Sequence, residues 1–227
     1  VGKTIFDLDE PIVKENIEET ILYLPRVYCA ILRTVMLNSL HLDLDAIVID
    51  VGAGKCDAAL HVAAILTDKL DIPIIQTRNN DTLNFGTPLC EAKMSLEEKI
   101  GTICTGIQHP YPHIHHDLCQ PTAGFWGVPP RDFAILKLFP DTTHVFGWTR
   151  CMENKTPDNW QLETLVNPDI PTIFYGQSFC AKTAMAKHLA SRHPRGLFLD
   201  CDVTAGNSTR AKIQAFLELN GVNHASC

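Results

Sequence analysis

The sequence of 227 residues contains nine cysteines but no Cys-x-x-Cys pair. Because the number is odd and the cysteines are widely spaced, they do not suggest the disulfide framework of a small secreted domain. Several of them, such as Cys29, Cys104 and Cys180, stand within apolar runs. This usage is typical of reduced thiols, so we expect a cytoplasmic protein.

Long apolar segments and an excess of positive charge are also missing. No apolar stretch approaches the roughly 20 residues of a membrane span, and the first residues lack the basic and apolar pattern of a secretion signal. Lysine and arginine total 19 against 26 acidic residues, which gives a formal net charge of -7. We therefore expect no membrane association and no broad nucleic-acid-binding face, although a local pocket for an anion fits this charge.

Alternation of strands and helices is the main signal that is present. Hydrophobic residues make up 45% of the chain, which is enough for a substantial core. Apolar runs typical of buried strands begin at Ala46, Ile72, His144, Ile170 and Leu197, in alternation with helical patterns. This order predicts an α/β fold with three layers, in which a mainly parallel sheet has helices on both faces.

We divide the chain into an N-terminal helical segment, residues 1–45, and a Rossmann-like α/β domain, residues 46–227. In the first part, one helix is expected from residue 11 to Pro25 and a second from Arg26 to about residue 40. These helices would form a cover over the sheet or a dimer-facing layer, so we expect a homo-oligomer. Another helix is expected from Ser95, as its N-cap, to Ile107. Residues 121–130, rich in glycine and proline, are predicted as a loop.

The last strand ends in acidic residues and a small, hydroxyl-rich loop. Asp200 and Asp202 follow the apolar run, and residues 204–209 lead into the final helix. Backbone N–H groups at a helix N-terminus bind anions, and carboxylates beside them hold sugar hydroxyls or Mg²⁺. The combination suits a sugar phosphate as ligand. The alternative is a plain helix cap by Asn207 or Ser208, as in any α/β protein.

This segment resembles the ribose-phosphate signature of type I phosphoribosyltransferases. It departs from the family at Cys201, where a second acid is usual, at Asp202, where an apolar residue is usual, and at Ala205, where a hydroxyl is usual. The resemblance implies a transferase of nucleotide metabolism that binds a phosphorylated small molecule with Mg²⁺. The residues implied to hold that ligand are Asp202, Thr204, Gly206, Asn207, Ser208 and Thr209.

The middle of the chain, around Thr149 and Arg150, is similar to uracil phosphoribosyltransferases. The resemblance implies displacement at the anomeric carbon of the ribose by a base nitrogen, with Asp200 and Arg150 as catalytic residues. The basic residue that this family keeps earlier in the segment is Thr122 here. Since departure of diphosphate needs charge neutralisation, a non-catalytic binding or assembly subunit is the alternative.

The turn after the first predicted strand is a second candidate site. It consists of Gly52, Ala53, Gly54 and Lys55. The phosphoribosyltransferase resemblance implies a diphosphate loop here, with Lys55 or Arg78 at a phosphate. Asp50 and the two glycines also resemble the first motif of S-adenosylmethionine-dependent methyltransferases, which makes S-adenosylmethionine the alternative cofactor. A plain structural turn and a site for another nucleotide are further alternatives.

Histidines gather between His109 and Cys119. In an extended segment His113 and His115 project to one face, so these two and Cys119 form a candidate metal site. A ligand-contacting or catalytic role is a second interpretation, and a solvated loop is the third.

Overall fold

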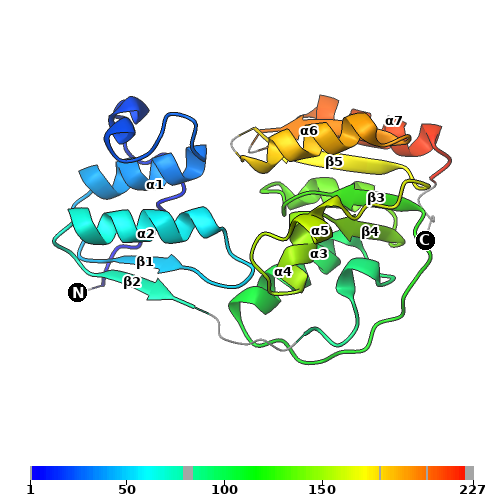
Figure 1. Cartoon of the computed structure of the whole chain (residues 1–227), viewed down its shortest axis with the longest axis horizontal. Coiled ribbons are helices and arrows are strands. Elements are labelled where there is room, and N and C mark those ends of the chain that lie inside the picture. The colour runs from blue at the N-terminus through cyan, green and yellow to red at the C-terminus, as the bar shows by residue number, and fades with distance from the viewer. Residues whose placement is uncertain (1, 79–83, 179, 203, 223–227) are drawn as a thin grey trace.

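The computed structural model describes residues 2–78, 84–178, 180–202 and 204–222. Each lobe of the chain contains parallel strands and helices, so the α/β class is confirmed (Figure 1). We call residues 2–78 the N-terminal lobe and residues 84–222 the C-terminal lobe. Within the described residues no helix is both long and apolar enough to cross a membrane.

The N-terminal lobe is built around a two-stranded parallel sheet. Its elements are the 3-10 helix η1 (Ile17–Leu22), α1 (Ala30–His41), β1 (Ile47–Asp50), α2 (Asp57–Lys69) and β2 (Ile74–Thr77). Residues of α1, β1 and α2 share one core, which includes Met36, Ile47 and Leu66. The predicted helical segment thus packs with the first strands of the predicted Rossmann-like domain, and not apart from them.

The first predicted helix is mostly absent, because only η1 forms within it. The carbonyl of Ile17 accepts hydrogen bonds from the Thr20 hydroxyl at 2.7 Å and from the buried Arg33 guanidinium at 2.9 Å. In an α-helix this carbonyl would instead accept a hydrogen bond from the backbone amide four residues later. The two side chains thus take the place of a helical hydrogen bond. The second predicted helix corresponds to α1.

A four-stranded, fully parallel sheet forms the centre of the C-terminal lobe, in the order β4-β3-β5-β6. Its strands are β3 (Ala123–Trp126), β4 (Thr143–Phe146), β5 (Thr172–Gln177) and β6 (Gly196–Cys201). The prediction of a loop over residues 121–130 was wrong, since β3 lies there between two other strands. Its four residues are all buried, and Gly124 leaves room for the Thr172 side chain of β5.

Helices pack against this sheet and form two separate hydrophobic cores with it. The elements are η2 (Leu89–Glu91), α3 (Leu96–Gln108), η3 (Phe133–Leu138), α4 (Trp148–Glu153), α5 (Trp160–Thr164), α6 (Lys182–Arg192) and α7 (Asn207–Leu219). Phe125 and Ile173 belong to a core with residues of α3, η3 and α7. Trp126 and Phe174 belong to a core with residues of α6.

Two predicted helix starts had different outcomes. The Ser95 hydroxyl accepts a hydrogen bond from the Glu98 amide at 3.2 Å, as the sequence predicts for the start of α3. Helix α7 begins after Gly206, and no side chain caps it, so neither Asn207 nor Ser208 serves as the N-cap.

Candidate functional site

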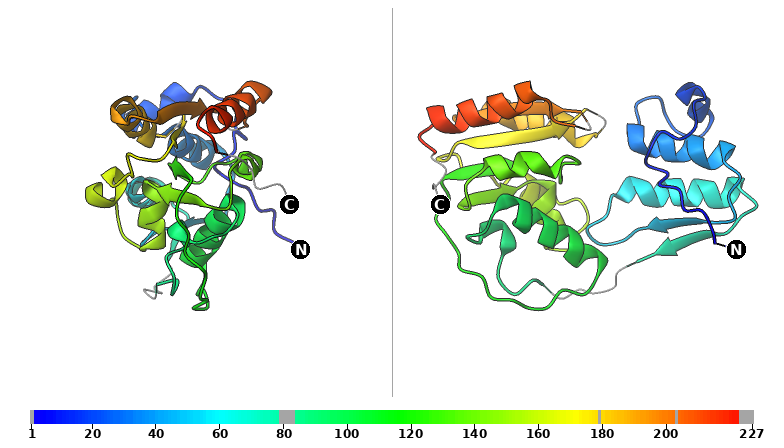
Figure 2. Two further views of the ribbon diagram at one scale, coloured as in Figure 1. Left: turned by 90° about the vertical axis from the view of Figure 1, so that its right-hand side faces the viewer. Right: turned by 180° about the vertical axis from the view of Figure 1, so that it is seen from behind.

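The carboxyl ends of both sheets lie where the two lobes meet. In Figure 1 the strands β1 and β2 point toward the C-terminal lobe, and the view from behind in Figure 2 shows β5 pointing back toward the N-terminal lobe. Helices α1 and α2 begin at this meeting point, and so does α6. Parallel α/β sheets bind ligands at the carboxyl ends of their strands, so a ligand site is expected here.

A cysteine stands at the start of each of these three helices. Cys29 is the N-cap of α1, Cys56 is the N-cap of α2, and Cys180 comes two residues before the first residue of α6. All three are free thiols, and Cys29 and Cys180 are half-buried whereas Cys56 is exposed. Three helices that begin where the lobes meet thus each carry a free thiol at or just before their first residue.

The electrostatics of these thiols agree with this arrangement. Burial raises the pKa of Cys180, the Lys182 amide lowers it, and thiolates at Cys29 and Cys56 raise it further. Burial also raises the pKa of Cys56, the amides of Ala58 and Ala59 lower it, and a thiolate at Cys29 raises it. Each thiolate thus makes the next one harder to form, unless a cation compensates the negative charge.

Contacts on the N-terminal side fix Cys29 and Cys56. The hydroxyl of Tyr28 donates to the carbonyl of Ala58 at 3.3 Å, which ties the start of α1 to the first turn of α2. Gly54 has φ 76°, and a Cβ there would lie 2.9 Å from Ile107 of α3. The turn before Cys56 therefore packs closely on the C-terminal lobe, which needs a glycine at this position.

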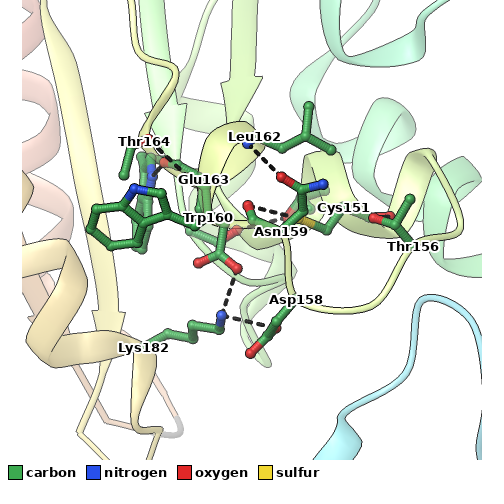
Figure 3. Close-up of polar contacts among 12 residues, drawn as sticks. Cys151, Thr156, Asp158, Asn159, Trp160, Leu162, Glu163, Thr164 and Lys182 are labelled. Carbon is green, nitrogen blue, oxygen red and sulfur yellow. Dashed lines mark hydrogen bonds and ion pairs between the residues drawn. The ribbon is translucent and has the colours of Figure 1, made fainter.

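On the C-terminal side, Lys182 anchors the first turn of α6 (Figure 3). Its ammonium donates to Asp158 at 2.9 Å and to the buried Glu163 at 2.6 Å, and it lies 5.2 Å from the centre of the Trp148 ring. Asp158 also raises the pKa of Cys56. This ion-pair network thus acts electrostatically on Cys56 through Asp158 and on Cys180 through Lys182.

The predicted phosphate loop before α7 already holds an anion of the protein itself. The amide of Ala205 donates to Asp132 at 3.2 Å, and the Arg210 guanidinium donates to the same carboxylate oxygen at 2.8 Å. Asp200 accepts a hydrogen bond from the Ser178 hydroxyl at 2.9 Å. A phosphate at the Ala205 amide would have to displace Asp132.

The predicted turn after β1 has the left-handed glycines that such a turn needs, with φ 110° at Gly52 and 76° at Gly54. Lys55, the lysine of this turn, is not available to a phosphate, because its ammonium forms an ion pair with Asp50. The same carboxylate accepts a hydrogen bond from Thr77 at 3.2 Å. Asp50 and Lys55 thus neutralise each other at the end of β1.

The remaining predicted site residues contact different partners and do not meet in one site. Arg150 forms an ion pair with Glu91, and among the described residues no hydrogen bond or ion pair joins it to Asp200. His115 contacts the Thr87 hydroxyl at 3.0 Å, whereas the sulfur of Cys119 lies 3.9 Å from His144.

No three His, Cys, Asp or Glu side chains within the described ranges surround a point closely enough to hold one metal ion. The candidate set of His113, His115 and Cys119 is therefore not assembled as a metal site. The same holds for a single ion between Cys29, Cys56 and Cys180.

The sequence alone does not connect these three cysteines. They are far apart in the chain, and no spacing pattern connects them. The helix predicted from Arg26 contains Cys29, so the place of this cysteine before α1 was not visible in the sequence. Only Cys56, directly after the predicted turn of residues 52–55, gave a signal of this kind. Comparison with protein-family models, with curated proteins and with solved structures gave no significant match for this chain.

Proposed function

We propose that Cys29, Cys56 and Cys180 bind an iron–sulfur cluster where the two lobes meet, and that the protein uses it as a redox centre. The observation that carries this proposal is that three free cysteines stand at the N-terminal ends of α1, α2 and α6, which all begin where the two lobes meet. Thiolates are the protein ligands that iron–sulfur clusters take.

Helix N-termini favour this chemistry. The partial positive charge there stabilises a thiolate, and amides such as those of Ala58 and Ala59 can donate to the sulfur. A cluster of iron ions would also offset the mutual repulsion of the three thiolates.

The lack of a compact ligand group among the described residues favours a cluster over a single metal ion. Sulfurs around one tetrahedral zinc ion lie about 4 Å apart, as Zn–S bonds of about 2.3 Å require. No group as close as that occurs among the residues that the structure describes. A polynuclear cluster spans a wider gap between its cysteines, so it suits a site shared by two lobes.

Three protein ligands leave one metal position of such a cluster open. Open positions are typical of catalytic metal sites, because a substrate atom can bind there directly. We infer that the cluster passes electrons to a small molecule bound at the same edge of the sheets, with an external one-electron donor supplying them.

Anaerobic reconstitution with Fe²⁺ and sulfide tests this function. The expected result is stoichiometric bound iron and sulfide with a visible charge-transfer absorption, lost in Cys29→Ser, Cys56→Ser and Cys180→Ser. Cys104→Ser is the matched control, because Cys104 is a free and half-buried thiol on α3. Equal iron content in all four variants, or binding of zinc alone, would contradict the proposal.

Several finer expectations remain proposals beside this one. They are a three-layer arrangement of the four-stranded lobe, a cytoplasmic location and a homo-oligomer. Free thiols at all described cysteines support a reducing compartment. The neighbours Val48 and Ile75, 64% and 48% exposed on the open face of the small sheet, support an apolar contact between copies. Ribose-phosphate binding with Mg²⁺ also stays a prediction.

A further inference from the structure

A pocket opens at the end of β1, where the turn toward Cys56 begins. It has a volume of about 400 Å³ and is lined by Asp50, Thr77, Arg78, Gln108 and His109. The first three residues stand at the carboxyl ends of β1 and β2, and the other two stand at the end of α3. Pockets of a few hundred Å³ accommodate small molecules.

The charges inside the pocket do not cancel. Asp50 is neutralised by its ion pair with Lys55 and accepts a further hydrogen bond from Thr77. Within the described residues the guanidinium of Arg78 has no hydrogen bond or ion pair, and the side chains of Gln108 and His109 have none. One positive charge and several hydrogen-bond donors therefore line the cavity without partners among the residues that the structure describes.

The backbone positions Arg78 for this role. A Cβ on Gly52 would lie 2.8 Å from the Cγ and 3.2 Å from the Nε of Arg78. The aliphatic part of the Arg78 side chain thus packs directly on the backbone of residue 52. This contact requires a glycine there, since a Cβ would collide with the arginine and the φ of 110° favours glycine. A fixed stem reduces the conformational entropy that the guanidinium loses when it binds a ligand.

We propose that this pocket binds a small organic anion through a carboxylate or phosphate group held by Arg78, with Gln108 and His109 as further donors. The planar guanidinium presents paired N–H groups that match both kinds of oxyanion. The inference rests on the pocket alone and does not depend on a metal cluster at the cysteines.

Calorimetric titration of the purified chain at constant ionic strength tests the pocket, with inorganic phosphate and succinate as probes and chloride as the reference. Binding of either probe supports the proposal, and the stronger one identifies the oxyanion. Arg78→Gln is expected to weaken that binding about tenfold or more, as loss of a charged hydrogen bond does. Arg192→Gln, which removes an exposed arginine on α6, is expected to bind like the wild type.

Two results would overturn the assignment. One is wild-type binding no stronger than that of chloride, and the other is equal binding by Arg78→Gln and the wild type. Circular dichroism of Arg78→Gln checks that the variant is folded. Because the titration uses protein without iron, its failure would leave the cysteine proposal untouched, and failed reconstitution would leave the anion pocket untouched.

Discussion

At the scale of single residues, Lys99 is the least expected side chain of the core. It is fully buried, and its ammonium donates to the Thr143 carbonyl at 2.5 Å. Burial lowers its pKa from 10.5, since water no longer solvates the charge. Helical periodicity placed Lys99 in a helix, but no pattern in the sequence showed that its charge would lie inside the protein.

Lys99 should therefore make stability depend on pH. Between its lowered pKa in the folded chain and 10.5, the unfolded chain binds a proton that the folded chain does not. The free energy of unfolding then rises with pH in this window. We expect the stability of wild type relative to Lys99→Met to increase from neutral pH toward 10.5.

Urea unfolding at several pH values measures this difference. Lys187→Met, which removes an exposed lysine of α6, corrects for pH trends that any loss of one lysine causes. The prediction would be refuted if the free energy of unfolding of wild type relative to Lys99→Met stayed constant or decreased with rising pH.

At the scale of elements, β3 shows where the sequence patterns fail. The sequence predicted five of the six strands, but Ala-Gly-Phe-Trp between prolines has the composition of a loop. Gly124 is required by close packing and not by a turn. A Cβ at this position would collide with the Thr172 hydroxyl and would lie 2.9 Å from the Phe146 ring. Such a contact exists only once the neighbouring strands are paired.

Gly124→Ala is expected to destabilise the protein by about 1–3 kcal/mol, as overpacking of a core does. Gly101→Ala is the comparison, because its Cβ would meet only Phe133 at 3.8 Å in a helix. That substitution should stabilise α3 by about 0.5–1 kcal/mol. Chemical unfolding of both variants checks the opposite signs, and equal effects would contradict the assigned packing of β3.

The loop between β6 and α7 allows a direct test of the ribose-phosphate hypothesis. If the loop binds phosphoribosyl diphosphate with Mg²⁺, Asp132 competes with the phosphate for Ala205 and Arg210. Asp132→Asn should then tighten binding about tenfold or more, and Asp200→Asn should abolish it. Calorimetry that detects no heat for the wild type or for Asp132→Asn would exclude the hypothesis, and heat with S-adenosylmethionine alone would support the methyltransferase alternative.

At the scale of the whole molecule, the proposed function depends on how the two lobes face each other. The sequence predicted the α/β class and most strands, yet it gave no sign that β1 and β2 form a sheet of their own. Strand pairing is decided by contacts between segments distant in the chain, which local periodicity does not report. For that reason nothing in the sequence related Cys29, Cys56 and Cys180 to one another until their helices were placed in space.

A crystal structure of the anaerobically reconstituted protein, with anomalous data collected at the iron edge, tests the central claim most directly. The account predicts iron density where α1, α2 and α6 begin, bonded to the sulfurs of Cys29, Cys56 and Cys180, with one iron free of protein thiolate. Iron bound instead between His113 and Cys119, or three cysteine sulfurs with no metal between them, would contradict it.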